Sequence, residues 1–309
     1  MKPVILLVGK NGLVGRQLTR FLPSIGEVIA LGRRQLDVTK PDEIRRVTRA
    51  VRPQIIVNAT AYKALDQAES DPSSARAVNT DAPRWLAEEA KKIGAGLVHY
   101  STDCVFDGTK AAPYLEEDPH NPINVYGQTK LDGELAVQQS GVPYLIFRVA
   151  RVYGREPGNF LTTVLRLSTQ REELRMVCDQ IGSPTWNREI ARRTTQVLAQ
   201  LVRRTDGSDV FGGASGVYNM ATCGETSWSG FAGAILEEAS ESRPAKKWFQ
   251  SATQNLPVAA CRIVPITTAE YPTPARRPAN SVLSNVRLAR TFQVQMPDWR
   301  AQLHDFFAG

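Results

Sequence analysis

Cysteine and histidine are scarce in this chain, and neither occurs in a pattern that binds metal or forms a disulfide framework. The four cysteines lie far apart without a Cys-x-x-Cys pair, and the three histidines have no ligand spacing. These absences exclude a zinc module and a small disulfide-stapled fold. Widely spaced thiols are typical of reduced cysteines in a cytosolic protein.

Long apolar runs and long basic runs are also missing. The longest apolar run near the N-terminus is Val4–Val8, far short of the ~20 residues of a membrane span, and no secretion signal is expected. The net charge is +7, but the basic residues stand in dispersed pairs such as Arg33–Arg34 and Arg45–Arg46. Such pairs favour a solvated surface or a small anionic ligand over a duplex-binding stripe. We expect a cytoplasmic protein without nucleic-acid or membrane partners.

The composition is that of a globular protein, and the first half alternates between strand and helix patterns. With 42% apolar and 22% charged residues, disorder is excluded, and 309 residues suggest about two domains. Strands alternating with helices predict a doubly wound α/β domain around a parallel sheet covered on both faces. The expected strands are Pro3–Val8, Val28–Leu31, Ile55–Val57, Gly96–Ser101 and Tyr144–Phe147.

Cap signals place the first helices. Thr39 is expected to cap a helix that begins near Pro41, and Asp71 to cap a long helix that runs to about Ile93. After about residue 151 strand and helix patterns no longer alternate regularly. Residues 243–282 are rich in proline and are expected to form irregular loops. We expect a Rossmann-type dinucleotide-binding domain over 1–150, to which a segment near 213–222 returns, and a smaller α/β domain over 151–309, mainly for substrate.

Three glycines lie between the first strand and the following helix. Gly9, Gly12 and Gly15 permit a tight turn and the close approach of a pyrophosphate to the amides of a helix N-terminus. A purely structural turn is the alternative. In an alternating α/β chain this position favours a dinucleotide cofactor.

The end of the second strand bears on which dinucleotide binds. Arg33 and Arg34 stand there, and no acidic residue occurs before Asp37. An arginine at this place accommodates a 2′-phosphate, so NADPH is favoured, although NADH remains possible. Both arginines could equally be solvated loop charges.

A tyrosine and a lysine share one helix face downstream of a Ser/Thr strand end. Tyr126 and Lys130 are four residues apart, and Thr102 ends the fourth strand. A lysine ammonium beside the phenol is expected to lower the tyrosine pKa towards neutrality, so that it can exchange a proton with a carbonyl oxygen. An ordinary exposed helix face is the alternative.

Together these motifs resemble the extended short-chain dehydrogenases/reductases, and within them the dTDP-4-dehydrorhamnose reductase family. The resemblance is carried by the glycine loop and by Leu36–Val38, Val57–Tyr62, Tyr100–Gly108, Tyr126–Lys130, Asp179–Thr185 and Arg277–Ser281. It implies that Tyr126 is the proton donor, Lys130 its partner and Thr102 the polarising hydroxyl. The implied cofactor residues are Gly9, Asn11, Gly12, Leu13, Val14, Gly15, Arg33, Asp37, Val38, Ala59, Ala61, Tyr62 and Lys63, with Tyr126 and Lys130. The implied substrate residues are Thr102, Asp103, Arg151 and Gln180.

Departures from the family pattern narrow the expected chemistry. Related dehydratases carry Thr-Asp-Glu where this chain has Thr102–Cys104, so carbonyl reduction is favoured over elimination of water. The family commonly has tyrosine in place of Cys104 and tryptophan in place of Arg151. These departures leave the identity of the substrate's sugar open. Gln17 and Arg188 stand where some members hold magnesium through glutamates. We therefore expect no metal, and a monomer or weak homodimer.

The resemblance implies NADPH-dependent reduction of the 4-keto group of dTDP-4-dehydro-L-rhamnose to dTDP-L-rhamnose. Two alternatives remain open. One is a non-catalytic NADP-binding regulatory subunit that resembles the β subunit of methionine adenosyltransferase. The other is a different nucleotide-sugar reductase or epimerase.

Overall fold

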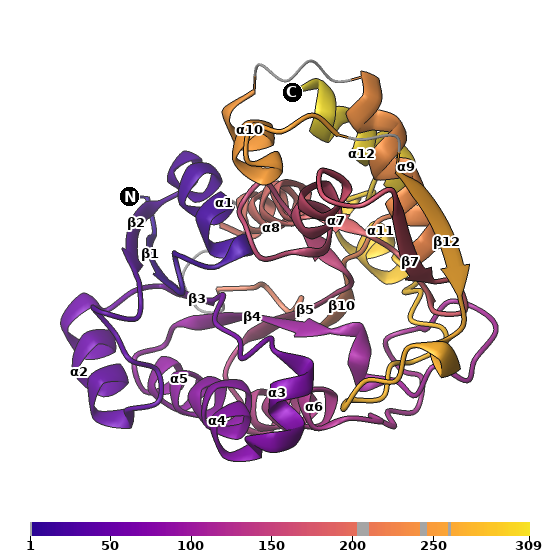
Figure 1. The fold of residues 1–309 in the computed structure, drawn as a ribbon. Helices are drawn as coiled ribbons and strands as arrows, with labels where there is room; N and C mark the ends of the chain where they lie inside the picture. Colours follow the sequence, from indigo (N-terminus) through magenta and orange to yellow (C-terminus); the bar gives the residue numbers. More distant parts are fainter. Residues whose placement is uncertain (1, 203–209, 242–245, 259–260) are drawn as a thin grey trace.

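The chain folds around a six-stranded parallel sheet, as seen in a computed structural model that describes residues 2–202, 210–241, 246–258 and 261–309 (Figure 1). The strand order is β2-β1-β3-β4-β5-β10. β1 pairs with β2 on one side and with β3 on the other. The order in which strands are added therefore switches from one side of β1 to the other after β2. The strands are β1 Val4–Val8, β2 Glu27–Leu31, β3 Ile55–Asn58, β4 Gly96–Thr102, β5 Tyr144–Val149 and β10 Gly216–Asn219. The predicted α/β fold class is confirmed.

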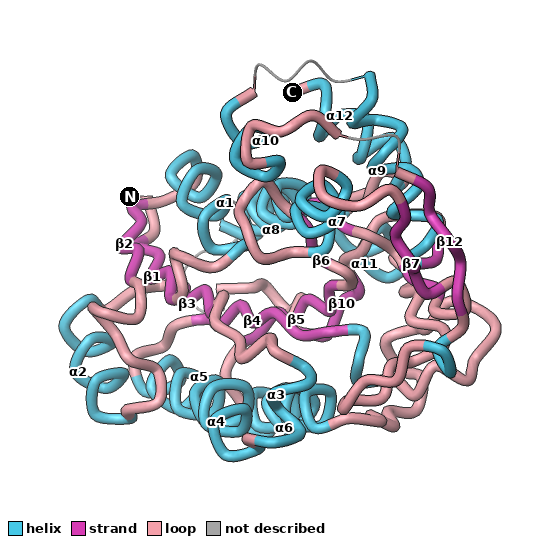
Figure 2. Tube along the Cα trace, in the orientation of Figure 1, coloured by secondary structure: helices cyan, strands magenta, loops and turns pink. Residues whose placement is uncertain are grey.

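Helices cover both faces of this sheet, because its strands bury both of their faces (Figures 1 and 2). In β1, Ile5 and Leu7 pack towards α1 and α8, whereas Leu6 and Val8 pack towards α2 and α5. On the first face lie α1 Leu13–Phe21, α8 Asn187–Val202 and α11 Val286–Phe292. On the second lie α2 Pro41–Val51, α3 Leu65–Ser70, α4 Pro72–Arg76, α5 Ala82–Lys92 and α6 Val125–Gln139.

A second, aromatic core lies beyond α8, above the carboxyl ends of the strands. Phe231, Phe306 and Trp186 are buried in it, and the Phe306 ring packs edge-on against those of Tyr153 and Trp186. Its helices are α7 Phe160–Ser168, α9 Trp228–Glu241, α10 Lys247–Thr253 and α12 Trp299–Ala308. Its two-stranded pairs are β6 Val152–Tyr153 with β9 Thr185–Trp186, β7 Glu173–Val177 with β12 Arg262–Ile266, and β8 Ile181–Gly182 with β11 Thr226–Ser227.

Three local expectations need correction. Thr39 does not cap α2; its hydroxyl donates to Asp37 at 2.7 Å, and Lys40 occupies the cap position without a side-chain bond. The helix that Asp71 caps is interrupted by a π-helical turn, Ala77–Asp81, before α5. The proline-rich stretch is only partly irregular, because α10 and β12 lie within it; residues 243–245 and 259–260 of that stretch fall outside the described part.

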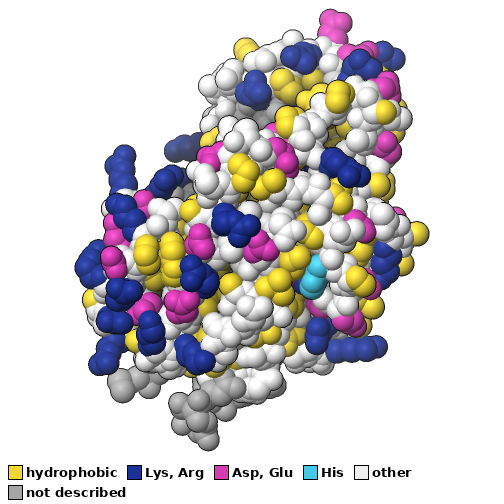
Figure 3. Space-filling view, turned by 90° about the horizontal axis from the view of Figure 1, so that it is seen from below, with side chains coloured by type: hydrophobic (Ala, Val, Ile, Leu, Met, Phe, Trp, Pro, Cys, Tyr) yellow, Lys and Arg dark blue, Asp and Glu magenta, His cyan; other side chains and the backbone are white. Residues whose placement is uncertain are grey.

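The surface mixes charges of both signs. On the face seen from below, lysine and arginine side chains are interspersed with acidic ones (Figure 3). Arg84 and Glu88 on α5, for example, are both exposed and pair at 3.5 Å. Within the described ranges no helix has both the length and the apolarity needed to span a bilayer.

Candidate active site

A cavity of about 740 Å³ opens at the carboxyl ends of β1, β3, β4 and β5. This is the place where doubly wound sheets bind ligands, because the loops after β1 and β3 diverge there. Of the residues predicted for cofactor, catalysis and substrate, all line this cavity except Gly15. The lining residues among them are Gly9, Asn11, Gly12, Leu13, Val14, Arg33, Asp37, Val38, Ala59, Ala61, Tyr62, Lys63, Thr102, Asp103, Tyr126, Lys130, Arg151 and Gln180.

The glycine loop leaves room for a ligand and lets β1 meet α1. Gly9 has φ +92°, and a Cβ there would lie 2.9 Å from the Ala59 backbone. A Cβ on Gly15 would lie 2.1 Å from the Gly9 carbonyl oxygen, so Gly15 serves helix–strand packing. No side chain caps the N-terminus of α1. Its first amides therefore face the cavity as an anion site.

The rim beyond β2 carries both a cation and a carboxylate. Arg33 is exposed, and its charge helps to lower the pKa of Asp37. The main cause of that lowered pKa is a pair of hydrogen bonds from the hydroxyl and amide of Thr39. Because a carboxylate repels an anion, Arg33 is the member of this pair that suits an anionic ligand.

The loop after β3 is held by a buried side chain from the helical layer that contains α5 and α6. Asn79, buried in the π-helical turn, accepts from the Tyr62 amide at 2.9 Å and donates to the Tyr62 carbonyl oxygen at 3.1 Å. The same amide group donates to Thr129 of α6. One buried side chain thus holds Ala61–Lys63 against the helix that carries Tyr126.

The N-terminus of α6 is capped by two separate side chains. Asn124 accepts from the Gly127 amide at 2.7 Å, and Glu69 of α3 accepts from the Val125 amide at 2.8 Å. Gly127 is required because a Cβ would lie 2.1 Å from the Cys104 carbonyl oxygen. This close approach brings Tyr126 beside the end of β4, where Thr102 interacts with its phenol.

The predicted lowering of the Tyr126 pKa by Lys130 is not seen. Burial raises the pKa of Tyr126 above its ordinary value, and the nearby Thr102 hydroxyl opposes this only in part. The Lys130 amine instead donates to the Tyr100 carbonyl oxygen at 2.5 Å and lies 3.3 Å from His99 Nε2. The i, i+4 spacing places both side chains on one face but leaves the direction of the amine open.

Arg151 forms part of the cavity wall beside Trp228 and Gln180. Its guanidinium donates to the carbonyl oxygens of Thr226 at 3.0 Å and Gln180 at 2.9 Å, and lies 4.3 Å from the centre of the Trp228 ring. Burial raises the pKa of the neighbouring Asp103, and the charge of Arg151 counteracts this. The Gln180 side chain donates to Thr268 and accepts from Trp228.

The Thr102 hydroxyl already has a partner. It donates to Asp103 at 2.9 Å and accepts from the Cys104 amide at 3.2 Å. To donate to a bound carbonyl oxygen, this hydroxyl must therefore turn away from Asp103.

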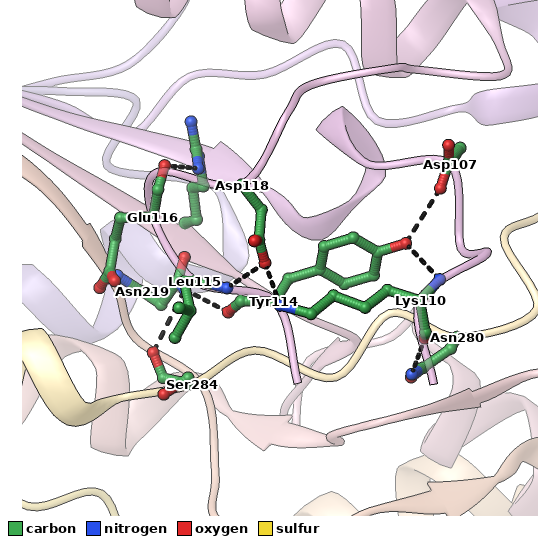
Figure 4. Close-up of polar contacts among 10 residues, drawn as sticks. Asp107, Lys110, Tyr114, Leu115, Glu116, Asp118, Asn219, Asn280 and Ser284 are labelled. Atoms are coloured by element: carbon green, nitrogen blue, oxygen red, sulfur yellow. Dashed lines mark hydrogen bonds and ion pairs between the residues drawn. The ribbon is translucent and has the colours of Figure 1, made fainter. Parts of the chain in front are cut away.

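The long connection that precedes α6 is fastened to the C-terminal loop beside the cavity (Figure 4). The Tyr114 hydroxyl donates to Asp107 at 3.0 Å and accepts from the Lys110 amide. Asn219 of β10 donates to the Tyr114 carbonyl oxygen at 2.9 Å, and Asn280 donates to that of Lys110 at 2.7 Å. These bonds hold the end of β10, the connection before α6 and the loop that contains Asn280 in one arrangement.

Several lining residues were not predicted. Trp228, Gly158 and Asn159 line the cavity from segments remote in sequence, and Lys63 donates to the Gly158 carbonyl oxygen at 3.4 Å. Among the lining residues outside the predicted set, a sequence signal through the family motifs exists for Leu36, Thr60, Tyr100, Ser101, Cys104 and the loop Arg277–Ser281. Outside the cavity, the Gln17 amide donates to Glu156, and the Arg188 guanidinium lies over the Trp186 ring.

Comparison with known proteins gives consistent matches over the whole chain. Residues 1–309 match the RmlD substrate binding domain family. A dTDP-4-dehydrorhamnose reductase from Burkholderia thailandensis is 46% identical over 297 residues, covering 96% of this chain and 95% of the relative. One from Escherichia coli K12 is 37% identical over 300 residues, covering 96% and 94%.

A solved structure agrees with these sequence matches. The dTDP-4-dehydrorhamnose reductase of Bacillus anthracis, in complex with NADP, superposes with a TM-score of 0.86 at 31% identity. The match covers 100% of this chain and 99% of that one. The family resemblance and the assignment as an oxidoreductase are confirmed. The chain belongs to the RmlD substrate binding domain family, the family of the dTDP-4-dehydrorhamnose reductases.

Proposed function

We propose that this protein reduces the 4-keto group of dTDP-4-dehydro-L-rhamnose to dTDP-L-rhamnose with NADPH, and that Tyr126, Lys130 and Thr102 carry the proton chemistry. The observation that carries the proposal is their convergence in one cavity with the glycine loop. An NADP complex of a relative with TM-score 0.86 supports the cofactor.

The residues around the cavity fit a dinucleotide phosphate. Gly9 lies so close to Ala59 that a side chain there would collide, and the uncapped α1 offers its amides. Arg33 supplies a cation at the rim, where a 2′-phosphate would need one. When bound, NADPH supplies the hydride that reduces the keto carbon.

The protein's own groups supply the proton. Tyr126 is held as a neutral phenol, because burial raises its pKa, and this is the form that can protonate the keto oxygen. Thr102, once turned from Asp103, donates to the same oxygen and stabilises the charge that develops there. The product is an alcohol, and the tyrosine regains its proton from solvent in the next cycle.

A direct assay tests the function. The protein is mixed with dTDP-4-dehydro-L-rhamnose and either reduced cofactor, and absorbance of the reduced nicotinamide is followed while the sugar product is identified. We expect stoichiometric oxidation of NADPH and formation of dTDP-L-rhamnose. A changed sugar without net cofactor oxidation would indicate an epimerase, and no reaction with any keto-sugar would indicate a regulatory subunit.

Arg33 gives a prediction about cofactor choice. We expect Arg33→Ala to weaken NADPH binding about tenfold, because an exposed charge-assisted contact to the 2′-phosphate is lost. NADH affinity should stay the same, since NADH lacks that phosphate. Fluorescence titration of both cofactors measures this, with Arg34→Ala as the matched control, because Arg34 does not line the cavity. An equal loss for both cofactors would contradict the assignment.

Arg151 gives a prediction about the sugar. We expect Arg151→Met to lower kcat/KM for the keto-sugar about tenfold, because two charge-assisted bonds that hold the wall are lost. NADPH affinity should not change. Arg151→Lys should rescue little, since an ammonium cannot stack on Trp228 as the planar guanidinium does. If the lysine variant restores full activity, charge alone explains the role of this residue.

A further inference from the structure

The loop that follows β12 brings into the cavity an arginine that the proposed function does not use. This loop, residues 271–281, reaches the layer of the molecule in which α3 and α6 lie (Figure 1). Arg277 lines the cavity, and its side chain is 23% exposed. A partly exposed guanidinium in a cavity wall can bind an anionic ligand that enters the cavity.

Several hydrogen bonds hold this loop in place. The carboxylate of Asp66 on α3 accepts from the Ala275 amide at 3.1 Å, and the Asn124 side chain donates to the Arg276 carbonyl oxygen at 2.8 Å. Further along the loop, the Gly108 carbonyl oxygen accepts from a backbone amide at 3.2 Å. A cation on this loop is therefore positioned before a ligand arrives, which reduces the entropy lost on binding.

The guanidinium of Arg277 is oriented from the side away from the cavity. It donates to Asp66 at 2.9 Å and to the Ala275 carbonyl oxygen at 3.2 Å. Asp66 is not among the lining residues, so its carboxylate lies behind the guanidinium as seen from the cavity. These two bonds use two of the five N–H donors of a guanidinium. The other donors have no protein acceptor in the described part of the chain.

The other cationic side chains that line the cavity have different positions or partners. Arg33 lies at the rim beyond β2, where the cofactor is expected. Lys63, Lys130 and Arg151 each donate to backbone carbonyl oxygens, and Lys130 is fully buried. Among the described lining residues, Arg277 is the remaining cation.

Arg277 also lies close to the reacting end of the cavity. Burial raises the pKa of the Cys104 thiol, and the positive charge of Arg277 opposes that rise. Cys104 packs through its carbonyl oxygen against Gly127, the residue after Tyr126. The guanidinium is therefore near enough to act on a residue that packs beside the proposed proton donor.

The shape of a sugar nucleotide relates these two places. Its diphosphate is attached to C1 of the pyranose, and a 4-keto group lies across the ring from it. When the keto oxygen meets Tyr126, the diphosphate must therefore lie near that phenol, separated from it by the sugar ring. A cation on the cavity wall beside Tyr126, and not in contact with it, suits that position.

We propose that Arg277, held by Asp66, binds the diphosphate of the sugar nucleotide and thereby determines which end of the pyranose faces Tyr126. This inference rests on the proposed function, which supplies the substrate class. A guanidinium can bind a phosphate through two parallel N–H bonds. The amides of α1 and the Arg33 side chain serve the phosphates of the cofactor, so cofactor and substrate have separate phosphate sites.

Titration with dTDP measures this contact without turnover. The protein is saturated with NADP⁺, and dTDP binding is followed by calorimetry. Arg277→Gln should weaken dTDP binding about tenfold or more, because charge-assisted bonds are lost. The matched control is Arg276→Gln, since Arg276 is exposed and does not line the cavity. Equal dTDP affinity in the two variants, or weaker NADP⁺ binding in Arg277→Gln, would overturn the proposal.

Asp66→Asn separates ligand binding from support of the loop. The asparagine oxygen can still accept from the Ala275 amide, whereas the negative charge beside Arg277 is removed. Loss of this partly exposed ion pair loosens the guanidinium but leaves its charge to the ligand, so dTDP affinity should stay within about threefold. A loss as large as that in Arg277→Gln would mean that the ion pair supports the cavity wall, and the guanidinium would not be the ligand.

Kinetics with the keto-sugar show on which part of the substrate Arg277 acts. A contact with the diphosphate is made equally in the ground state and the transition state, so Arg277→Gln should raise KM about tenfold and change kcat less than about threefold. A fall in kcat at unchanged KM would place Arg277 at the reacting oxygen and refute the proposed contact. If the unmodified protein binds dTDP but reduces no keto-sugar, the proposed function is wrong and the assignment of Arg277 stands.

Discussion

Tyr126→Phe is expected to abolish most keto-sugar reduction while leaving the fold and the cofactor site in place. The substitution removes one oxygen from a ring that lines the cavity. A positioned general acid contributes about 10²- to 10⁴-fold to a rate, and kcat should fall within that range. The ring itself remains, so NADPH affinity should change by less than about twofold. Stopped assays with product analysis measure the rate, and fluorescence titration measures the affinity.

Tyr144→Phe is the matched control for this variant. Tyr144 begins β5, at the opposite end of the strands from the cavity, and it is not among the lining residues. Loss of its hydroxyl should leave kcat unchanged. If Tyr126→Phe turned over as fast as this control, the proton would have to come from another group, and the proposed role of Tyr126 would be wrong.

The elements that sequence could predict are those whose signal is local. Val4–Val8 is buried on both faces and reads as a continuous apolar strand, and the glycine loop follows at once. A π-helical turn has no such signal: Ala77–Asp81 continues the periodicity of its helix, and only the packing against α6 distinguishes it. Thr39 was misplaced because Asp37, two residues earlier, competes for its hydroxyl.

The site shows the same division between local and long-range information. Tyr126, Lys130 and Thr102 were predicted because helix spacing and a strand end bring them together. Asn79 and Trp228 were not, since Asn79 holds the Tyr62 backbone and Trp228 lines the cavity from distant segments whose places depend on the tertiary fold. The pKa of Tyr126 was predicted in the wrong direction, because spacing does not reveal burial or the Tyr100 carbonyl oxygen that takes the lysine amine.

The largest loss of stability is expected from breaking the buried ion pair between α6 and β5. Arg148 of β5 and Glu134 are both almost fully buried, and the guanidinium donates to the carboxylate at 3.0 and 2.6 Å. It also donates to the Glu116 carbonyl oxygen at 3.0 Å. Arg148→Met keeps the volume but leaves a buried carboxylate unpaired. Such a change costs about 3–5 kcal/mol, which urea unfolding would show as a lower midpoint with an unchanged slope.

The double variant Arg148→Met with Glu134→Leu separates charge from packing. If the unpaired carboxylate causes the loss, removing it should recover much of the stability, because apolar residues of similar volume often replace a buried pair without loss. The exposed pair of Arg262 and Glu173 provides the control, and Glu173→Gln should cost less than about 1 kcal/mol. A loss that persists in the double variant would assign the effect to the contacts of Arg148 with Glu116 and Phe106 instead.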